Sequence, residues 1–134
     1  MGQQQLLLII VSILLIAFAI AVALSIINAQ RVISNRDAIV NDLNDIVANA
    51  NQFKLRPTNS GGGGGVYNTS RGAANNYDIP AVMKSNANAT YFCTVASDKI
   101  TIVGISGQYT DGTVTVTVNV DGSIPTWSYG EDFK

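Results

Sequence analysis

A long apolar run lies near the start of the chain. It covers the 22 residues from Leu6 to Ile27, is broken only by Ser12 and Ser25, and contains no charge, glycine or proline. This length meets the requirement of about 20 apolar residues for a membrane-spanning helix. A cleavable secretory signal is the competing interpretation, but such signals begin with basic residues, which positions 1–5 lack. The pattern therefore predicts a permanent apolar helix over residues 6–27.

The helical pattern continues beyond this run in an amphipathic form. Apolar residues recur at helical spacing through Val32, Ile39, Leu43 and Ile46, with charged residues between them. The first clear helix breaker is Pro57. The sequence thus predicts one helix of about fifty residues over 1–56, roughly 75 Å long at about 1.5 Å per residue. Its uncharged part is too long to pack on the remaining residues, so it must contact lipid or identical helices.

The last third of the chain has the pattern of an antiparallel sheet. Four segments alternate or run apolar with many β-branched residues: 90–96, 99–106, 113–120 and 124–129. Asp121-Gly122 is a typical tight-hairpin pair. The predicted fold class is therefore α+β, with a long helix over 1–56, of which 28–56 packs on the head. A Gly-, Asn- and Ser-rich linker and loop follows over 57–89, and a small antiparallel β-sheet head of about four strands forms residues 90–134.

A second amphipathic face predicts how helix and sheet meet. In residues 113–120 the valines occupy one face and the threonines the other. The valine face is expected to pack on the amphipathic half of the helix, with Tyr67 and Tyr77 as further anchors. Trp127 either closes this core or contacts another subunit. The predicted helix-to-head packing residues are Ile39, Leu43, Ile46, Phe53, Val114, Val116, Val118 and Trp127.

Five consecutive glycines, Gly61 to Gly65, separate helix and head. They predict either a flexible link or a loop whose backbone lies close to another segment. A phosphate-binding loop is disfavoured, because the lysine and the strand-to-helix context that such loops need are missing.

The composition limits the partners and cofactors that can be expected for this chain. Of 134 residues 47% are hydrophobic and 13% charged, the formal net charge is -1, and no dense Lys/Arg run occurs. Nucleic acid is therefore not expected as a partner. The chain has no histidine and a single cysteine, which argues against zinc and haem sites and leaves no expected cofactor. Cys93 is expected to be a small buried apolar residue, with an intersubunit bridge as the alternative.

The head offers no pattern typical of catalysis. Its carboxylates are scattered at turns, where Asp is conformationally favoured, so no catalytic residue is named and no enzyme activity is expected. Two glycosylation acceptor sequences occur, at Asn68 and Asn88.

The order of these features resembles the type IV pilin superfamily. The resemblance covers the whole chain and is most specific in residues 1–53, where a polar fifth position precedes a charge-free helix that turns amphipathic after Asn28. It implies assembly from the inner membrane by an ATPase-driven machine, with the apolar helices packed as a filament core. The residues expected in this core are Leu6, Leu7, Ile10, Ile13, Leu14, Ile16, Phe18, Ile20, Leu24 and Ile27.

The chain departs from the family pattern at two places. Gln5 stands where the family usually has a glutamate that pairs with the N-terminal amine of a neighbouring subunit. A glutamine can still accept a hydrogen bond from an amine, so Met1 and Gln5 are the predicted N-terminal polar contact. The alternative is that Gln3 to Gln5 rest at a membrane interface. No glycine or proline interrupts residues 3–56, which predicts a more continuous helix than in many bacterial pilins. Major pseudopilins bind calcium near the C-terminus, but the spacing of Asp111, Asp121, Glu131 and Asp132 fits no tight calcium loop and favours solvated turn residues.

The expected function is that of a structural subunit of an extracellular, type IV pilus-like helical filament, serving adhesion, motility or surface attachment. Its expected partners are copies of itself in a helical homopolymer, the inner or cytoplasmic membrane before assembly, and a pilus or secretion assembly machinery. Two alternatives stay open. One is a type II secretion major pseudopilin in a periplasmic pseudopilus, and the other is a monomeric, single-span, membrane-anchored binding protein.

Overall fold

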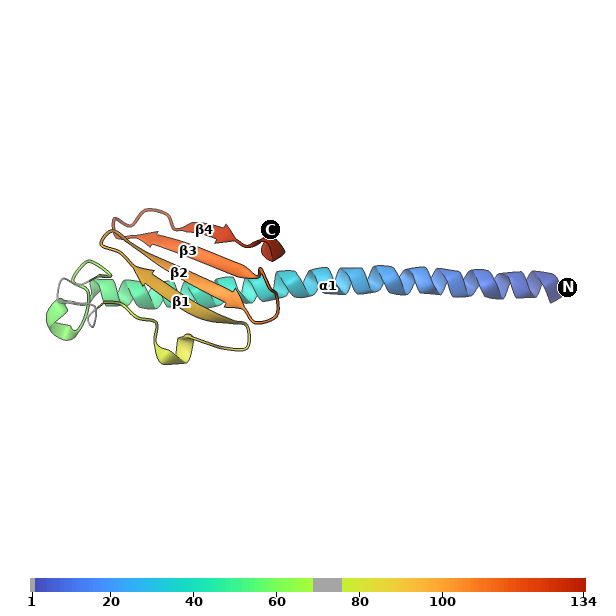
Figure 1. Ribbon diagram of the computed structural model, residues 1–134, viewed down its shortest axis with the longest axis horizontal. Helices are drawn as coiled ribbons and strands as arrows, with labels where there is room; N and C mark the ends of the chain where they lie inside the picture. Colours follow the sequence, from blue (N-terminus) through green and yellow to red (C-terminus); the bar gives the residue numbers. More distant parts are fainter. Residues whose placement is uncertain (1, 69–75) are drawn as a thin grey trace. The chain divides into compact units, whose positions relative to one another are not determined.

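The computed structural model describes residues 2–68 and 76–134 (Figure 1). It contains one long helix, α1 (Gly2–Leu55), and the four strands β1 (Ala89–Val95), β2 (Lys99–Ser106), β3 (Thr113–Asn119) and β4 (Thr126–Tyr129). Among the described residues, single-turn 3-10 helices occur between α1 and β1, at Thr58–Ser60 and Ala81–Met83, and after β4, at Glu131–Phe133. The predicted α+β class, with one long apolar helix and four antiparallel strands, is confirmed.

The chain divides into two compact units, residues 1–34 and 35–134. The first unit is the N-terminal part of α1, and its described residues are exposed apart from the half-buried Val32. α1 itself runs without a break for 54 residues, as the absence of glycine and proline from its interior predicts. The second unit, here called the head unit, contains residues 35–55 of α1 and all four strands.

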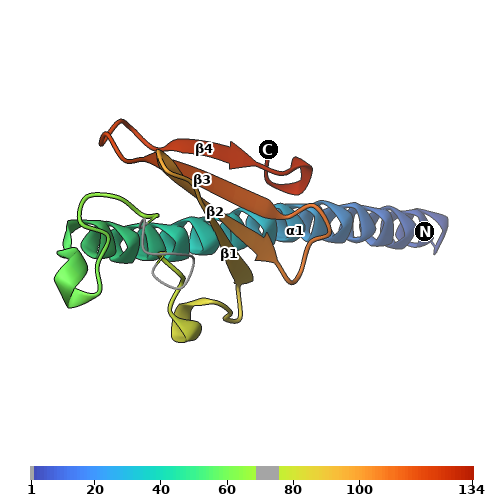
Figure 2. The same ribbon diagram turned by 60° about the vertical axis from the view of Figure 1, so that its left-hand side comes forward.

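The sheet of the head unit is a simple meander. Its strand order is β1-β2-β3-β4, and every neighbouring pair is antiparallel (Figures 1 and 2). In β3 the valines are buried and the threonines half-buried, so the alternation in the sequence matches the two faces of the sheet. One face thus forms the core of the head unit.

The core lies between this face and residues 35–55 of α1. The buried helical residues are three or four positions apart: Asn35, Ile39, Leu43, Ile46 and Ala50. Both ribbon views show the sheet beside this part of α1. At Gly104 of β2 the two layers approach closely, because an added Cβ would lie 2.8 Å from Ile39 Cγ2 and 2.9 Å from Tyr91 Cε1.

Two tyrosines anchor the connecting segment on α1. Tyr67 and Tyr77 are buried, and their hydroxyls donate hydrogen bonds to Asn51 Oδ1 (2.7 Å) and Asn49 Oδ1 (3.1 Å). The anchoring role expected for both residues is therefore confirmed. Burial raises the pKa of each hydroxyl, so both remain protonated donors at neutral pH.

The glycine run forms a close-packed cap on the end of α1. Gly63 N donates to Phe53 O (2.8 Å), and Gly65 N donates to Lys54 O (2.7 Å). These amides satisfy carbonyl groups that the last helical turn leaves without partners. Of the two interpretations of the glycine run, the close backbone approach is the one present: a Cβ on Gly63 would lie 1.7 Å from Val66 O.

We expect Gly63→Ala to destabilise the head unit by about 1–3 kcal/mol, because its methyl group would overlap Val66 O and force the capping loop to rearrange. Chemical denaturation of the detergent-solubilised chain, followed by the fluorescence of its single tryptophan, measures the effect. Gly107→Ala is the matched control, since nothing lies within 4 Å of its Cβ position and its φ is not left-handed. Equal stability of the two variants would contradict the cap.

Candidate functional site

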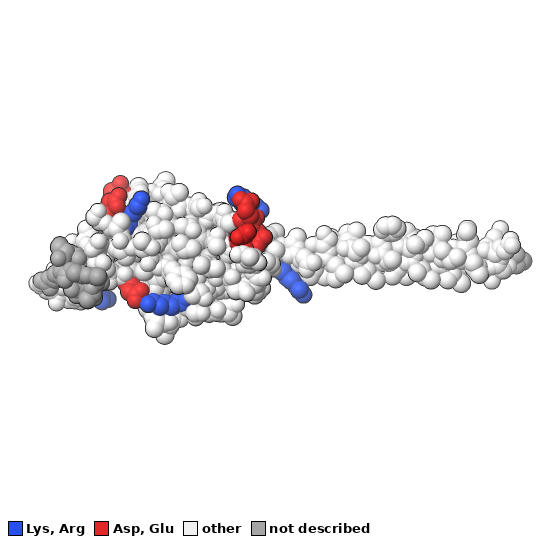
Figure 3. Space-filling model, in the orientation of Figure 1, with Lys and Arg blue, Asp and Glu red and all other residues white. Residues whose placement is uncertain are grey.

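Most of the exposed large apolar side chains among the described residues lie in the first unit. Every residue expected in a filament core is strongly exposed, from 46% at Ile27 to 70% at Phe18. On the face drawn in Figure 3, this part of α1 carries no Lys, Arg, Asp or Glu before the end of the apolar run. Soluble monomers rarely expose a contiguous apolar patch larger than a few hundred Å². We call residues 6–27 the apolar segment.

The apolar segment is long and apolar enough to cross a membrane. Burying each of its large side chains in lipid or in protein contributes roughly 1.5–3 kcal/mol. Of its two polar interruptions, Ser12 and Ser25, the first is satisfied within the helix, because the Ser12 hydroxyl donates to Leu8 O at 2.7 Å. This residue therefore needs no outside partner in a dry environment.

The predicted N-terminal polar contact is only partly within the described structure. Gln5 is an exposed residue of α1, and its side chain has no hydrogen-bond partner among residues 2–68 and 76–134. Met1 lies outside the described residues. The proposed pairing between copies thus stays a prediction.

A polar cluster joins α1 to the loop before β1. Asp42 Oδ2 accepts hydrogen bonds from the hydroxyl of Tyr91 (2.6 Å) and from the side-chain amides of Asn86 (2.8 Å) and Asn88 (3.0 Å). Next to it, Ser106 Oγ donates to Asn35 Oδ1 at 2.7 Å. Both groups of contacts link α1 to residues more than forty positions away and fix the register between helix and sheet.

Electrostatics make the Asp42 cluster sensitive to acid. Burial alone would raise the pKa of Asp42, but the hydrogen bonds from Tyr91, Asn88 and Asn86 outweigh it and lower the pKa below its ordinary 3.8. Burial, the hydrogen bond to Asp42 and the charge of Asp42 raise the pKa of Tyr91, which keeps its hydroxyl a donor. The cluster therefore contains an ionised acceptor and neutral donors at neutral pH.

A group whose pKa is lowered by folding stabilises the protein above its unfolded pKa, and this stabilisation is lost as the pH falls through the folded value. We expect Asp42→Asn to cost about 1 kcal/mol at pH 7, a small figure because Asp42 is partly exposed. The difference from the wild type should shrink as the pH falls below 3.8 and vanish once Asp42 is protonated in the folded state. Denaturation curves across pH measure it. Asp45→Asn, on an exposed carboxylate with no hydrogen bond from the described residues, should change stability little at any pH; a parallel response of both variants would contradict the assignment.

The remaining packing residues occupy distinct places. Ile39, Leu43, Ile46, Val114, Val116 and Val118 are buried in the head unit. Phe53 is half-buried, and its ring centroid lies 5.6 Å from that of Tyr77. Trp127 is half-buried on the edge strand β4, opposite Val116, so neither of its two expected roles is settled.

Cys93 is half-buried, so the prediction of a small buried residue holds only in part, and the alternative of an intersubunit bridge stays a prediction. Its side chain lies on the same face of the edge strand β1 as the buried Ala89 and Tyr91, and its Sγ is 3.9 Å from Tyr77 O. Burial raises the pKa of its thiol, so it is a weak nucleophile at neutral pH.

The C-terminal carboxylates do not converge. Asp132 Oδ2 accepts a hydrogen bond from the backbone amide of Asp111 (2.9 Å), Asp121 Oδ1 accepts one from Ser123 N (2.9 Å), and Glu131 pairs with Lys134. Within residues 2–68 and 76–134, no group of three or more His, Cys, Asp or Glu residues could hold a metal ion.

The two glycosylation acceptors differ in setting. Asn68 is half-buried, and the rest of its acceptor sequence lies outside the described residues. Asn88 is half-buried too, and its Nδ2, the atom that would carry a glycan, donates to Asp42. Modification of either residue stays a prediction.

Sequence reasoning missed several important residues. Tyr91 and Phe133 are buried, and Gly104 allows the contact between helix and sheet. The alternation in residues 89–95 could have indicated Tyr91. Phe133 lies in a short C-terminal turn with no periodic pattern, so no sequence signal indicated it.

Comparison with protein-family models, with curated proteins and with solved structures finds no match to this chain.

Proposed function

We propose that this protein is a structural subunit of a helical filament that polymerises through the apolar segment of α1. In this proposal, each subunit first crosses a membrane as a single-span helix. It then moves into a polymer in which the apolar segments of many copies cover one another. The filament is extracellular and type IV pilus-like, and serves adhesion, motility or surface attachment.

The observation that supports this most is the exposure of the apolar segment together with the position of the buried residues. All buried residues of α1 lie between Asn35 and Ala50, so the core of the head unit does not use the apolar segment. A surface this long and this apolar needs lipid or protein around it. A continuous helix can meet either need without exposing backbone groups.

The composition of the segment also supports a dry environment. Within it, Ser12 is satisfied by its own helix, and no charge occurs between Gly2 and Gln30. The same properties would suit a monomeric membrane anchor. Only assembly of many copies into a polymer distinguishes the proposed function from that alternative.

Electron microscopy of material sheared from producing cells tests the proposal, with the protein identified by mass spectrometry. Thin filaments containing this chain are the expected result. Protein that stays in the membrane and dissolves in detergent as a monomer would overturn the proposal in favour of the membrane-anchored monomer. Short polymers confined to the periplasm would replace the extracellular filament with a pseudopilus.

A further inference from the structure

One charged residue lies in the first unit, and it has no partner. Arg31 is the only charged side chain among residues 2–34, is exposed, and forms no hydrogen bond or ion pair with any described residue. It follows the end of the apolar segment by four positions. In the proposed polymer its guanidinium would lie at the border of the dry region, where an unpaired charge is costly.

Most acidic side chains of the head unit are already engaged. Asp37, Asp78 and Glu131 form ion pairs with cations of the same copy. Asp42, Asp121 and Asp132 accept the hydrogen bonds described above. Three carboxylates have no partner among the described residues: Asp45, Asp98 and Asp111. Of these, only Asp45 lies on α1; the other two lie in turns between strands.

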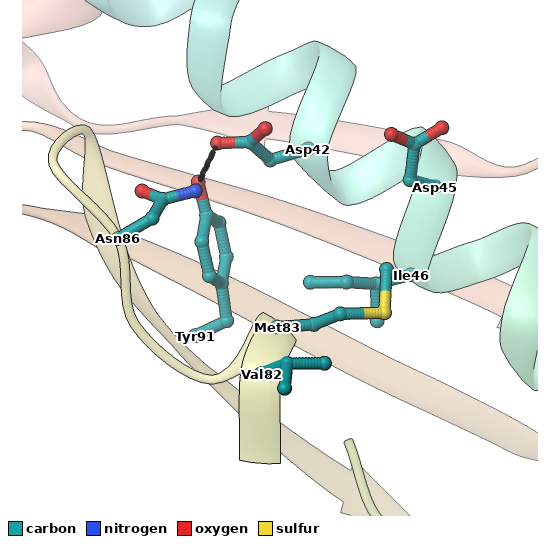
Figure 4. A pocket seen from close by; sticks show the side chains of 7 residues that line it. All are labelled: Asp42, Asp45, Ile46, Val82, Met83, Asn86 and Tyr91. Atoms are coloured by element: carbon teal, nitrogen blue, oxygen red, sulfur yellow. Dashed lines mark hydrogen bonds between the residues drawn. The ribbon is translucent and has the colours of Figure 1, made fainter. Parts of the chain in front are cut away.

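Asp45 lines a hollow on the head unit (Figure 4). The hollow has a volume of about 210 Å³, and Asp42 and Asp45 contribute carboxylates from α1. Apolar surface faces them from Val82, which is 87% exposed, and from Met83. A side chain with an apolar stem and a cationic end is complementary to this arrangement, because the stem covers Met83 and Val82 while the charge meets the carboxylates.

The spacing of Arg31 and Asp45 along α1 is compatible with contact between two copies. They are 14 positions apart, so two parallel helices bring Arg31 of one level with Asp45 of the other at an axial offset of about 21 Å. The apolar segment is roughly 33 Å long at the same rise. Two copies with this offset would still share about 12 Å of apolar contact.

From the charge complementarity we infer that the hollow beside Asp45 is the docking site for Arg31 of a second copy of this chain. The inference rests on the proposed function, since it names a contact within the same polymer. It adds that the contact has a direction: the helix of one copy meets the head unit of the next. Polymer growth would then require each incoming head unit to accept the arginine of a copy offset along the axis.

Charge exchange tests the pairing in cells. Arg31→Asp and Asp45→Arg should each reduce the yield of sheared filaments on the order of tenfold, at unchanged amounts of membrane-inserted protein. The double variant, which restores opposite charges, should recover most of the yield. Lys99→Asp and Asp98→Arg are matched controls on exposed, unpartnered charges elsewhere, and should assemble normally.

A second measurement identifies the contact directly. With Cys93→Ser as background, cysteines placed at positions 31 and 45 should be joined between copies by a short thiol-reactive cross-linker in filaments, and not in detergent monomers. Normal assembly of the single charge variants, or failure of the double variant to recover while the controls assemble, would overturn the pairing. The proposed filament would then assemble without the pairing of Arg31 and Asp45. Absence of filaments from the wild-type chain would overturn the proposed function itself.

Discussion

Cells that produce the Ile16→Asp chain are expected to release no filaments. Ile16 lies in the middle of the apolar segment, is 59% exposed in the isolated chain, and is one of the residues expected to face other copies. Placing a carboxylate there buries an unpaired charge, which costs several kcal/mol in every subunit. Because each subunit of a polymer repeats this cost, the loss should be complete. Electron microscopy and the amount of protein in the sheared fraction measure it.

Two control variants separate assembly from folding. Ile16→Leu keeps the apolar surface and should assemble as the wild type does. Ile124→Asp places the same charge on a side chain of the head unit that is 90% exposed, and should also leave filaments intact. Normal filaments from Ile16→Asp would show that the apolar segment is not buried between copies, and would overturn the proposed function.

The elements of the fold could be predicted because each has a local period. The helix and the strand over 113–120 are examples, since spacing of three or four residues and strict alternation appear within a short window. The observed strand β3, Thr113–Asn119, and the observed helix, Gly2–Leu55, differ from the predicted bounds by one residue at the C-terminal end. Their side-chain burial follows the same two periods.

The contacts that fix these elements in place could not be predicted in the same way. Tyr91 and Asp42 are 49 positions apart, and nothing in either local sequence indicates the hydrogen bond between them. The glycine run predicted close approach or flexibility equally well, because glycine permits both. Only the hydrogen bonds from Gly63 N and Gly65 N to carbonyl groups of the last helical turn distinguish a cap from a link. Long-range contacts of this kind are set by the packing of the whole head unit.

Of the candidate assembly surface, likewise, one part could be predicted from the sequence and the other could not. Exposure of the apolar segment follows from its length, since the head is too small to cover it. The hollow beside Asp45 brings together α1, the turn at 81–83 and β1, and therefore has no signal in the sequence. Arg31 and Asp45 look like ordinary solvated charges until the structure shows which carboxylates are engaged.

We expect Leu43→Ala to destabilise the head unit by about 2–5 kcal/mol. Leu43 has no exposed surface and lies in the middle of the helical face that packs on the sheet, so its truncation leaves a cavity that neighbouring side chains fill only in part. Denaturation of the detergent-solubilised chain, followed by the fluorescence of Trp127, measures the change. Leu55→Ala is the matched control, because the same substitution on the same helix removes a side chain that is 77% exposed, and should cost less than about 0.5 kcal/mol. Similar effects of the two substitutions would contradict the packing of α1 on the sheet.

If filaments need a folded head unit, the yield of Leu43→Ala filaments should fall at a lower temperature than the yield of wild-type filaments. Ile16→Asp should instead abolish filaments at every temperature, while its head unit unfolds as in the wild type.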